Sequence, residues 1–278
     1  MTSNTEPYLL GLDNNASARL NLQHFWTQST CGYLINSKIP VSPDAKIADI
    51  GTGTGIWALG VSKAYPTAQV DGFDITDAQF PPKEWLPANV ALSTLDILGT
   101  IPEELVGKYD IVHVRYFGLM VRQDNLTRLA TNLSLLLKPG GYLQWVEVDV
   151  AGQVAIPSSP TVSSSRTAAF CDKAREFFSA SGISYDWVSK LGDTLRAIDM
   201  IDVVQEKPEI SLSLSPIFSF LAIGGWVEMS HTVLDKYGPN PILGSGEELR
   251  KSLALVKQEL QSGVALKQQL YVTLGRRK

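Results

Sequence analysis

The stretch KIADIGTGTGIWALGVSKAYP, from Lys46 to Pro66, decides the fold of this chain. An apolar run that contains one acid, Asp49, stops at Gly51, and helix-forming residues begin at Ile56. This pattern predicts a buried strand, a tight glycine turn and the start of a helix. Glycines let the backbone turn sharply and let a ligand approach closely, and the helix N-terminus offers unpaired N–H groups. Such a turn suits a ligand with polar or anionic groups.

A second strand is predicted over 69–74 and ends in Asp74, where an acid can accept hydrogen bonds from both hydroxyls of a ribose. Asp71 competes for this role, but it lies earlier in the strand. A nicotinamide dehydrogenase would use the same device, with the fingerprint G-x-G-x-x-G/A. Here the spacing is G-x-G-x-G, and Ile56 stands where the fingerprint has Gly or Ala. This departure from the fingerprint argues against a dinucleotide cofactor and favours a nucleoside cofactor without a pyrophosphate.

Five motifs occur in the order and spacing of class I S-adenosylmethionine (SAM) methyltransferases. They are DIGTGTGIW (49–57), GFDIT (72–76), LDIL (95–98), YDIVHVRYF (109–117) and LLKPGGYL (136–143). Over residues 17–150 the chain resembles this class and, within it, the fungal UMTA-type group, which includes many small-molecule enzymes of secondary metabolism. The resemblance implies a Rossmann-like α/β fold, with a mostly parallel seven-stranded sheet, helices on both faces and an α-helical cap.

The resemblance also implies which residues bind SAM and its product S-adenosylhomocysteine (SAH). The glycine loop would lie against the methionine part of SAM, and Asp49 would hold this loop through backbone N–H groups or ordered water. Asp74 would take the ribose, while Asp96 would receive the adenine amino group with the Ile97 N–H facing the ring. The full set of residues implied for the cofactor is Asp49, Gly51, Thr52, Gly53, Gly55, Asp74, Ile75, Asp96, Ile97 and Arg115.

Three residues are candidates for the chemistry: His24, Arg115 and Glu147. His24 lies in a predicted N-terminal helix, which in this class often closes over the cofactor; local packing or capping is the alternative. Arg115 ends the fourth strand, where it can pair with a carboxylate, anchor the substrate or only stabilise the loop. Glu147, near the end of the fifth strand, can orient or deprotonate a substrate or only hold the backbone. We expect His113 to be a buried histidine with its hydrogen bonds satisfied.

Methyl transfer from a sulfonium is an in-line displacement, so the protein has to align the reacting atoms and exclude water. No metal is needed. A hydroxyl acceptor would want a base such as His24, His231 or Glu147, whereas a thiol would need less help. The sequence does not choose between O, N, S and C acceptors. The aromatic residues that could line the cavity are Trp26, Tyr33, Tyr116, Phe117, Trp145, Phe218 and Trp226.

The composition of the chain limits the kinds of partner that it is expected to bind. The chain has 278 residues and a net charge of −4, so it is long enough for a large α/β domain, and strong nonspecific binding to nucleic acid is not expected. Its two cysteines, Cys31 and Cys171, favour a reducing compartment over a disulfide framework or metal cluster. The N-terminus does not resemble a secretory signal, and no apolar run is long enough to span a bilayer. We expect a cytoplasmic protein with a small-molecule substrate, no membrane partner and no metal; a homodimer is left open.

Strands alternating with helices up to residue 148 imply a parallel sheet. The expected strands are 47–50, 69–74, 90–95, 109–114, 141–148, 200–214 and 266–275, and the expected helices are 17–36, 55–65, 124–137, 166–180, 186–199, 218–237 and 247–262. Residues 1–16 are expected to form a loose arm, and 151–165 a loop. We expect one methyltransferase domain over 1–278, with a lid helix in 17–45, the SAM-binding core in 46–150, sheet completion and helical cap insertions in 151–262, and the last strand in 263–278.

The expected function is SAM-dependent methylation of a small molecule, and three alternatives accompany it. Nucleic-acid amino methyltransferases carry an Asn/Asp/Ser-Pro-Pro-aromatic motif after the fourth strand, where this chain has Arg115-Tyr116-Phe117-Gly118. Some relatives of the UMTA-type group are noncatalytic regulators of secondary metabolism, although this chain lacks a long tail. SAM could also serve as a positive charge in a cyclisation or rearrangement, as in a pericyclase.

Overall fold

The computed structural model describes residues 9–278, so the first half of the expected N-terminal arm, residues 1–8, lies outside the described residues. The chain forms two compact units. The sheet unit comprises Thr27–Val150, Ile183–Ile210 and Gln269–Lys278, and the helical unit comprises the chain up to Trp26, Ala151–Gly182 and Ser211–Gln268. The single domain expected over 1–278 stays a prediction.

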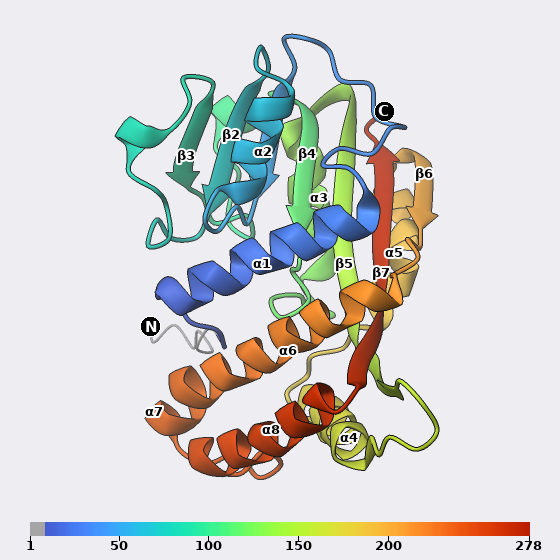
Figure 1. The fold of residues 1–278 in the computed structure, drawn as a ribbon. Coiled ribbons are helices and arrows are strands. Elements are labelled where there is room, and N and C mark those ends of the chain that lie inside the picture. Colours follow the sequence, from blue (N-terminus) through green and yellow to red (C-terminus); the bar gives the residue numbers. More distant parts are fainter. Residues whose placement is uncertain (1–8) are drawn as a thin grey trace. The chain divides into compact units, whose positions relative to one another are not determined.

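The sheet unit is built on seven strands in the order β3-β2-β1-β4-β5-β7-β6 (Figure 1). Strands β1 to β5 pair in parallel, and β6 is antiparallel to β7. The strands are β1 (Lys46–Ile50), β2 (Gln69–Asp74), β3 (Val90–Thr94), β4 (Tyr109–Arg115), β5 (Leu137–Pro157), β6 (Ile201–Glu206) and β7 (Val264–Arg276). This architecture confirms the expected Rossmann-like sheet.

Helices cover both faces of this sheet, and the side chains of β4 alternate between them. Val112 and Val114 join a hydrophobic cluster with α3 (Leu126–Leu136) and α5 (Asp186–Ala197). His113 projects to the other face and stacks on Trp57 of α2 (Ile56–Ala64). Both strands are covered on both faces, because consecutive residues along β1 and β4 are buried.

The helical unit is organised around aromatic contacts between α4 (Ser165–Ala180) and α6 (Ser215–Met229). Phe170, Phe177 and Phe178 on one face of α4 pack on Trp226 of α6. The other elements of this unit are the first part of α1 (Asn14–Cys31), a π-helical turn (Ser230–Leu234), α7 (Asp235–Tyr237) and α8 (Gly246–Gln261). The helices α4 and α8 confirm those expected over 166–180 and 247–262.

Three predicted boundaries are wrong, in the loop at 151–165, the strand at 200–214 and the helix at 218–237. The loop expected over 151–165 begins only after Pro157, because β5 continues beside β7 until the N–H of Ser158 donates to the carbonyl of Gly263 at 2.8 Å. The strand expected over 200–214 ends at Glu206, and a short 3-10 turn, Leu212–Leu214, precedes α6. The helix expected from residue 218 begins at Ser215, since Pro216 is well tolerated in the first turn of a helix.

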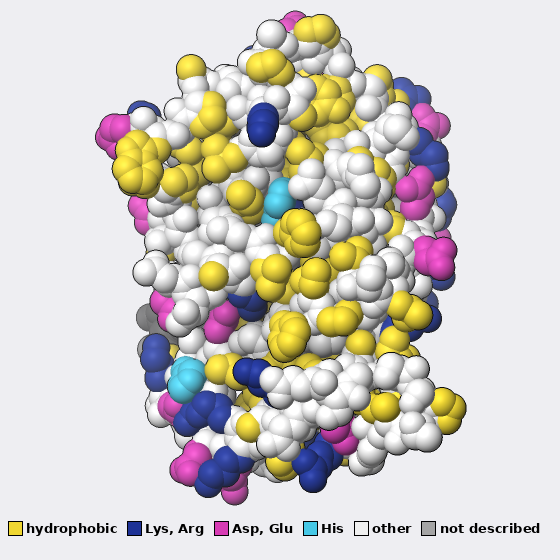
Figure 2. Space-filling view, viewed as in Figure 1, with side chains coloured by type: hydrophobic (Ala, Val, Ile, Leu, Met, Phe, Trp, Pro, Cys, Tyr) yellow, Lys and Arg dark blue, Asp and Glu magenta, His cyan; other side chains and the backbone are white. Residues whose placement is uncertain are grey.

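One helical stretch within residues 9–278, Leu212–Tyr237, is long and apolar enough to cross a membrane by length and composition alone. This refines the expectation that no run would be long enough. Core helices of other proteins have the same composition, and here Phe218 and Trp226 are buried. On the face shown in Figure 2, hydrophobic side chains are scattered among polar ones, and Lys and Arg are interspersed with Asp and Glu.

Candidate functional site

The glycine loop of the sheet unit turns directly after β1. Gly51, Gly53 and Gly55 have φ angles of 70°, 56° and 74°, a left-handed conformation that glycine adopts without strain. The N–H groups of Gly51 and Thr52 both donate to the carbonyl of Phe73, at 2.8 and 2.9 Å, which ties the loop to the end of β2. Because α2 begins at residue 56, the N-terminal N–H groups of this helix follow the loop immediately.

Asp49 is linked to this loop through the side chain of Thr52, and its expected bonds to backbone N–H groups or ordered water stay a prediction. Its carboxylate accepts a hydrogen bond from the Thr52 hydroxyl at 2.7 Å, and its other oxygen lies 2.8 Å from Nδ1 of His113. His113 also stacks on Trp57, with ring centroids 3.7 Å apart. Burial lowers the pKa of His113, and Asp49 opposes this effect. His113 is therefore the satisfied buried histidine that the sequence predicted.

Asp74 lies at the end of β2, next to the glycine loop. Its two carboxylate oxygens accept hydrogen bonds from the N–H groups of Gly53 and Ile75, both at 2.8 Å. Burial raises the pKa of Asp74, and these N–H donors oppose the shift. A carboxylate has about four acceptor positions, so acceptor capacity remains for a ligand hydroxyl. The side chain of Ile75 is 60% exposed, as expected of an apolar residue that a flat ligand would cover.

Asp71, the competitor for the ribose, is engaged elsewhere. It accepts from the Lys108 ammonium at 3.0 Å and from the Tyr109 hydroxyl at 2.8 Å. These contacts join the beginnings of β2 and β4, whereas Asp74 ends β2 beside the glycine loop. The side-chain contacts of Asp71 therefore favour Asp74 as the ribose acid, and this role of Asp74 stays a prediction.

The turn after β3 carries the third candidate group. Asp96 accepts from the N–H of Leu98 at 2.9 Å, and the buried side chain of Ile97 anchors the turn in the hydrophobic cluster. The amide of Asn132 on α3 donates to the Ile97 carbonyl at 2.7 Å. Because β1, β2 and β3 are parallel neighbours, the glycine loop, Asp74 and Asp96 all lie at the same edge of the sheet.

A cavity of the sheet unit lies beside this edge and contains Arg115. His113 and Arg115 are two residues apart on β4, so both project to the face that the cavity occupies. Burial raises the pKa of Cys31 to about 11 against the effect of Arg115, so its thiol stays neutral near pH 7. Burial also lowers the pKa of Arg115, and Asp49 opposes this effect. The guanidinium of Arg115 is the group of this cavity that can pair with a carboxylate. The lining residues are Thr27, Gln28, Cys31, Tyr33, Leu34, Trp57, His113, Arg115, Gln144 and Val146.

Glu147 is buried on β5, and its carboxylate accepts hydrogen bonds from backbone N–H groups. It accepts from the N–H of Phe117 at 2.7 Å and from that of Val148 at 3.1 Å. Burial raises the pKa of Glu147 to about 8, although these donors oppose the shift. Because Gln144 and Val146 line the cavity, alternation along β5 directs Glu147 to the opposite face. These contacts support the structural alternative, and the catalytic role of Glu147 stays a prediction.

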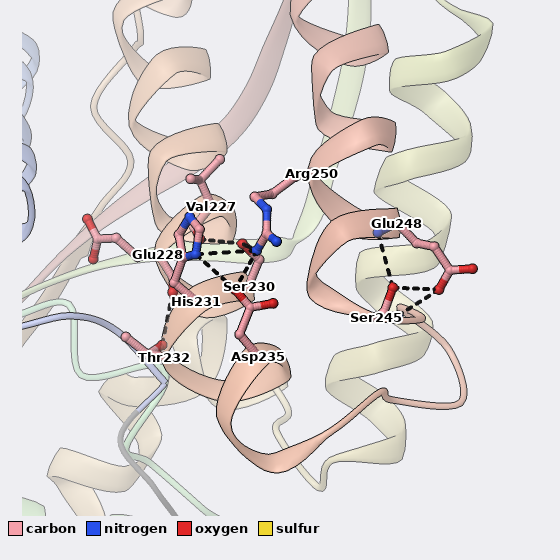
Figure 3. Close-up of polar contacts among 9 residues, drawn as sticks. All are labelled: Val227, Glu228, Ser230, His231, Thr232, Asp235, Ser245, Glu248 and Arg250. Carbon is pink, nitrogen blue, oxygen red and sulfur yellow. Dashed lines mark hydrogen bonds and ion pairs between the residues drawn. The ribbon is translucent and has the colours of Figure 1, made fainter.

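The two histidines considered as bases belong to the helical unit. His24 lies on α1, and its catalytic role stays a prediction. His231 is exposed, and its Nδ1 lies 3.0 Å from Asp235 and 3.3 Å from Arg250 (Figure 3). Figure 3 also shows the capping box of α8, in which Ser245 and Glu248 bond to each other. His231 is therefore part of a surface ion-pair cluster.

Tyr116 and Thr27 form a contact in the sheet unit that sequence reasoning did not single out. Tyr116 directly follows β4 with a φ of 60°, which a bulky residue rarely adopts. Its hydroxyl is hydrogen-bonded to that of Thr27 on α1. Strained backbone of this kind collects at functional sites, and the position just after a central strand was the only available signal.

Known proteins resemble this chain in sequence. A family model described as a methyltransferase domain matches residues 34–183, more than half of the chain. Methyltransferase grgD of a Penicillium species is 38% identical over 51% of this chain and 52% of its own length. N-methyltransferase tcpN of Claviceps purpurea is 31% identical over 70% and 69%. The secondary metabolism regulator LAE1 of Hypocrea atroviridis is 29% identical over 57% and 45%. The chain spans about half the length of several curated relatives that it matches.

Solved structures share the fold. A phosphoethanolamine N-methyltransferase 2 of Haemonchus contortus, in complex with phosphomonomethylethanolamine and S-adenosylhomocysteine, superposes with a TM-score of 0.51 at 15% identity, covering 96% of this chain and 60% of that one. The [4+2]-cyclase SpnF superposes with a TM-score of 0.52 at 15% identity, covering 94% of both chains. At this level of identity, the likeness concerns the fold alone.

Proposed function

The chain belongs to the methyltransferase-domain family, and we propose that it transfers the methyl group of SAM to a small molecule of secondary metabolism. The observation that carries the proposal is the common edge at which the glycine loop, Asp74 and Asp96 meet. The SAM- or SAH-bound fold neighbours and the relatives named methyltransferases support it.

The residues of this edge fit a nucleoside with an amino-acid tail. Asp74 accepts from the ribose hydroxyls, the exposed Ile75 covers one side of the adenine, and Asp96 with the Ile97 N–H takes its edge. Gly51, Thr52, Gly53 and Gly55, held by Asp49, approach the methionine part without side chains in the way. The Arg115 guanidinium pairs with the methionine carboxylate in the cavity.

When bound, SAM supplies a methyl group that is already activated by the sulfonium. The work of the chain is to position the acceptor in line with that methyl group and to exclude water. His24 acts as a base where the acceptor has to lose a proton, and Arg115 orients the reacting groups. Glu147 supports the site indirectly, because it accepts a hydrogen bond from the backbone N–H of Phe117. Relatives named N-methyltransferases, tcpN among them, favour a nitrogen acceptor.

We also propose that the protein works in the cytoplasm, on a free small molecule, without a metal and without nucleic acid or a membrane as a partner. Its net charge of −4 and the mixture of basic and acidic side chains on the face in Figure 2 support this. A homodimer is left open.

Calorimetry with SAM, SAH and a nicotinamide dinucleotide tests the cofactor. We expect binding of SAM and SAH, and the proposal fails if neither binds or if the dinucleotide binds more tightly. Incubation with methyl-labelled SAM and candidate metabolites tests the reaction. Label in the metabolite supports methyl transfer, whereas a converted metabolite with intact SAM supports the alternative of a cyclase, for which the fold of SpnF offers a precedent. Bound SAM with no conversion at all would favour a regulator.

A further inference from the structure

Asn132 is a polar residue on the buried face of α3, in the sheet unit, and it is 9% exposed. The buried residues of this helix are Leu129, Ala130, Asn132, Leu133 and Leu136. The Nδ2 atom of Asn132 donates to the carbonyl of Ile97 at 2.7 Å and to that of Gly99 at 3.0 Å. Both partners are acceptors, so the atom that faces them is the amide nitrogen, and both of its N–H groups are used. Asn132 therefore ties α3 to the turn that follows β3.

This turn, Asp96–Gly99, is closed by its own backbone. The N–H of Gly99 donates to the carbonyl of Asp96 at 3.0 Å. A β-carbon added to Gly99 would lie 3.1 Å from that carbonyl oxygen and 3.3 Å from Oδ2 of Asp96, so the turn is tightly wound. The buried side chain of Ile97 joins the hydrophobic cluster that includes Leu129 of α3. Because Asn132 holds two carbonyls of this turn, it fixes the shape of the turn relative to α3.

A single peptide group connects Asn132 to the carboxylate of Asp96. The bond between Ile97 and Leu98 is trans, so its C=O and its N–H point to opposite sides. The C=O of this peptide accepts from Asn132, and its N–H, which belongs to Leu98, donates to Oδ1 of Asp96 at 2.9 Å. Rotation of the peptide would break both hydrogen bonds together. Asn132 therefore sets the direction of the Asp96 carboxylate without touching it.

The carboxylate of Asp96 keeps acceptor positions for a ligand. Asp96 is exposed, and a carboxylate offers about four acceptor positions, one of which the Leu98 N–H occupies. The N–H of Leu95, just before the turn, donates to the carbonyl of Asp74 at 2.7 Å. The acid expected at the ribose and the acid expected at the base are therefore joined through hydrogen-bonded backbone.

A carboxylate held in this way can distinguish two purine edges. An amino group on the base donates to the carboxylate, whereas a carbonyl at the same place would bring two acceptors together. A site built to bond one group rejects an analogue without it, because a polar group of the site is then left unpaired. The distinction depends on direction, since a hydrogen bond weakens steeply when its D–H···A angle falls below about 120°. A residue that fixes the direction of the carboxylate thus takes part in base selection.

We propose that Asn132 is a positioning residue for base selection: through the Ile97–Leu98 peptide it directs the Asp96 carboxylate so that the site prefers a base with an amino group to one with a carbonyl. The inference rests on the proposed function, in which Asp96 and the Ile97 N–H take the edge of the adenine. It adds a residue of α3 that does not touch the cofactor and yet determines which base the site accepts.

Calorimetry with two matched ligands tests the proposal. S-inosylhomocysteine has the sugar and amino-acid tail of SAH, but its base carries a carbonyl in place of the amino group. We expect the wild type to bind SAH at least tenfold more tightly than S-inosylhomocysteine. Asn132→Leu, which removes both donors at similar size, should reduce this preference to less than about threefold. An unchanged preference would overturn the proposal.

Leu136→Ala is the control for a general loss of stability. Leu136 is fully buried one turn along the same helix, so its truncation leaves a cavity and should lower the Tm. The preference for SAH over S-inosylhomocysteine should nevertheless equal that of the wild type. If Leu136→Ala loses the preference as Asn132→Leu does, the effect reports a weakened helix and not positioning, and the proposal is wrong.

A double-mutant cycle with Asp96→Ala tests the route of the effect. Asp96→Ala alone should abolish the preference, and adding Asn132→Leu should then change the ratio of the two affinities less than about twofold, because the hydrogen-bonded route ends on Asp96. A further large change in the double variant would show that Asn132 acts by another route, which contradicts the proposal. If Asn132→Leu yields no folded protein, Asn132→Thr, which keeps one donor, replaces it. An unchanged preference in that variant would be equally fatal.

The same measurements separate this inference from the function proposed above. If SAH binds the wild type and Asn132→Leu keeps the full preference, Asn132 is only structural, and the cofactor assignment stands. If the wild type binds SAH and S-inosylhomocysteine equally well, the roles of Asp96 and Asn132 at the base are both refuted, although a nucleoside cofactor remains. If neither ligand binds the wild type, the proposed function fails and this inference fails with it.

Discussion

The ring of Phe117 occupies the space beside the α-carbon of Gly51: a β-carbon added there would lie 2.4 Å from Cε2 of that ring. Phe117 is in turn fixed by the hydrogen bond from its N–H to Glu147. The glycine loop is therefore packed against the segment that follows β4. Glycine at this position serves the packing as well as the turn, since its φ is +70°.

Gly51→Ala should lower both stability and SAH affinity. We expect a loss of about 1–3 kcal/mol beyond the strain of the left-handed backbone, because the ring has to move for the methyl group. Gly140→Ala is the matched control, since Gly140 has a φ of +80° with no atom within 4 Å of the added carbon. Urea unfolding measures the loss of stability, and calorimetry measures the loss of SAH affinity. Equal losses in Gly51→Ala and Gly140→Ala would show that the contact with Phe117 contributes nothing.

Asp74→Ala should weaken SAH binding about 10- to 100-fold, because a hydrogen bond to a charged group contributes about 1.5–3 kcal/mol. Asp71→Ala, on the same strand, should instead affect stability and leave SAH binding nearly unchanged. It should lower the free energy of unfolding by about 1–3 kcal/mol, since it leaves Lys108 and Tyr109 without their partner, and change the SAH dissociation constant less than about twofold. If calorimetry shows that Asp71→Ala loses more SAH affinity than Asp74→Ala, Asp71 and not Asp74 would be the ribose acid.

The order of the strands and helices could be predicted because its signals are local. Glycine and proline mark the turns, and apolar periodicity separates strands from helices between them. The end of β5 was missed for a local reason too. Val148, Val150 and Ile156 favour an extended chain, but the Ser- and Pro-rich segment that follows was assumed to begin at 151 instead of 158.

The sequence named candidate site residues but not their contacts. Asp49, Asp74 and Asp96 are recognisable from their places near the ends of strands: Asp49 is one residue before the end of β1, Asp74 ends β2, and Asp96 follows β3. The partner of Asp49, in contrast, is His113, 64 residues away, and no local pattern reveals which buried groups will meet across a sheet.

His24→Ala tests the base that was proposed from the sequence. With an acceptor whose methylated atom loses a proton, we expect turnover to fall about 100-fold or more while SAH affinity stays within about twofold, because a general base contributes roughly 10²–10⁴ to the rate. His231→Ala is the control, since that histidine is 58% exposed in an ion-pair cluster. Turnover unchanged by His24→Ala would leave it a structural residue, and an equal fall in both variants would point to an indirect effect.

Glu147 should make stability depend on pH between about 4.5 and 8. Its pKa is raised from 4.5 to about 8 in the folded chain, so over this range the folded state holds a proton that the unfolded state has released. The free energy of unfolding therefore falls as pH rises and levels off above pH 8, with a total on the order of a few kcal/mol. Glu147→Gln cannot ionise and keeps an oxygen that accepts from Phe117. Urea unfolding at pH 5, 6.5 and 8 should show that the free energy of unfolding of the variant rises relative to that of the wild type as pH rises. A constant difference across the three values would mean that Glu147 is ionised throughout and that its backbone contacts, not burial, set its charge.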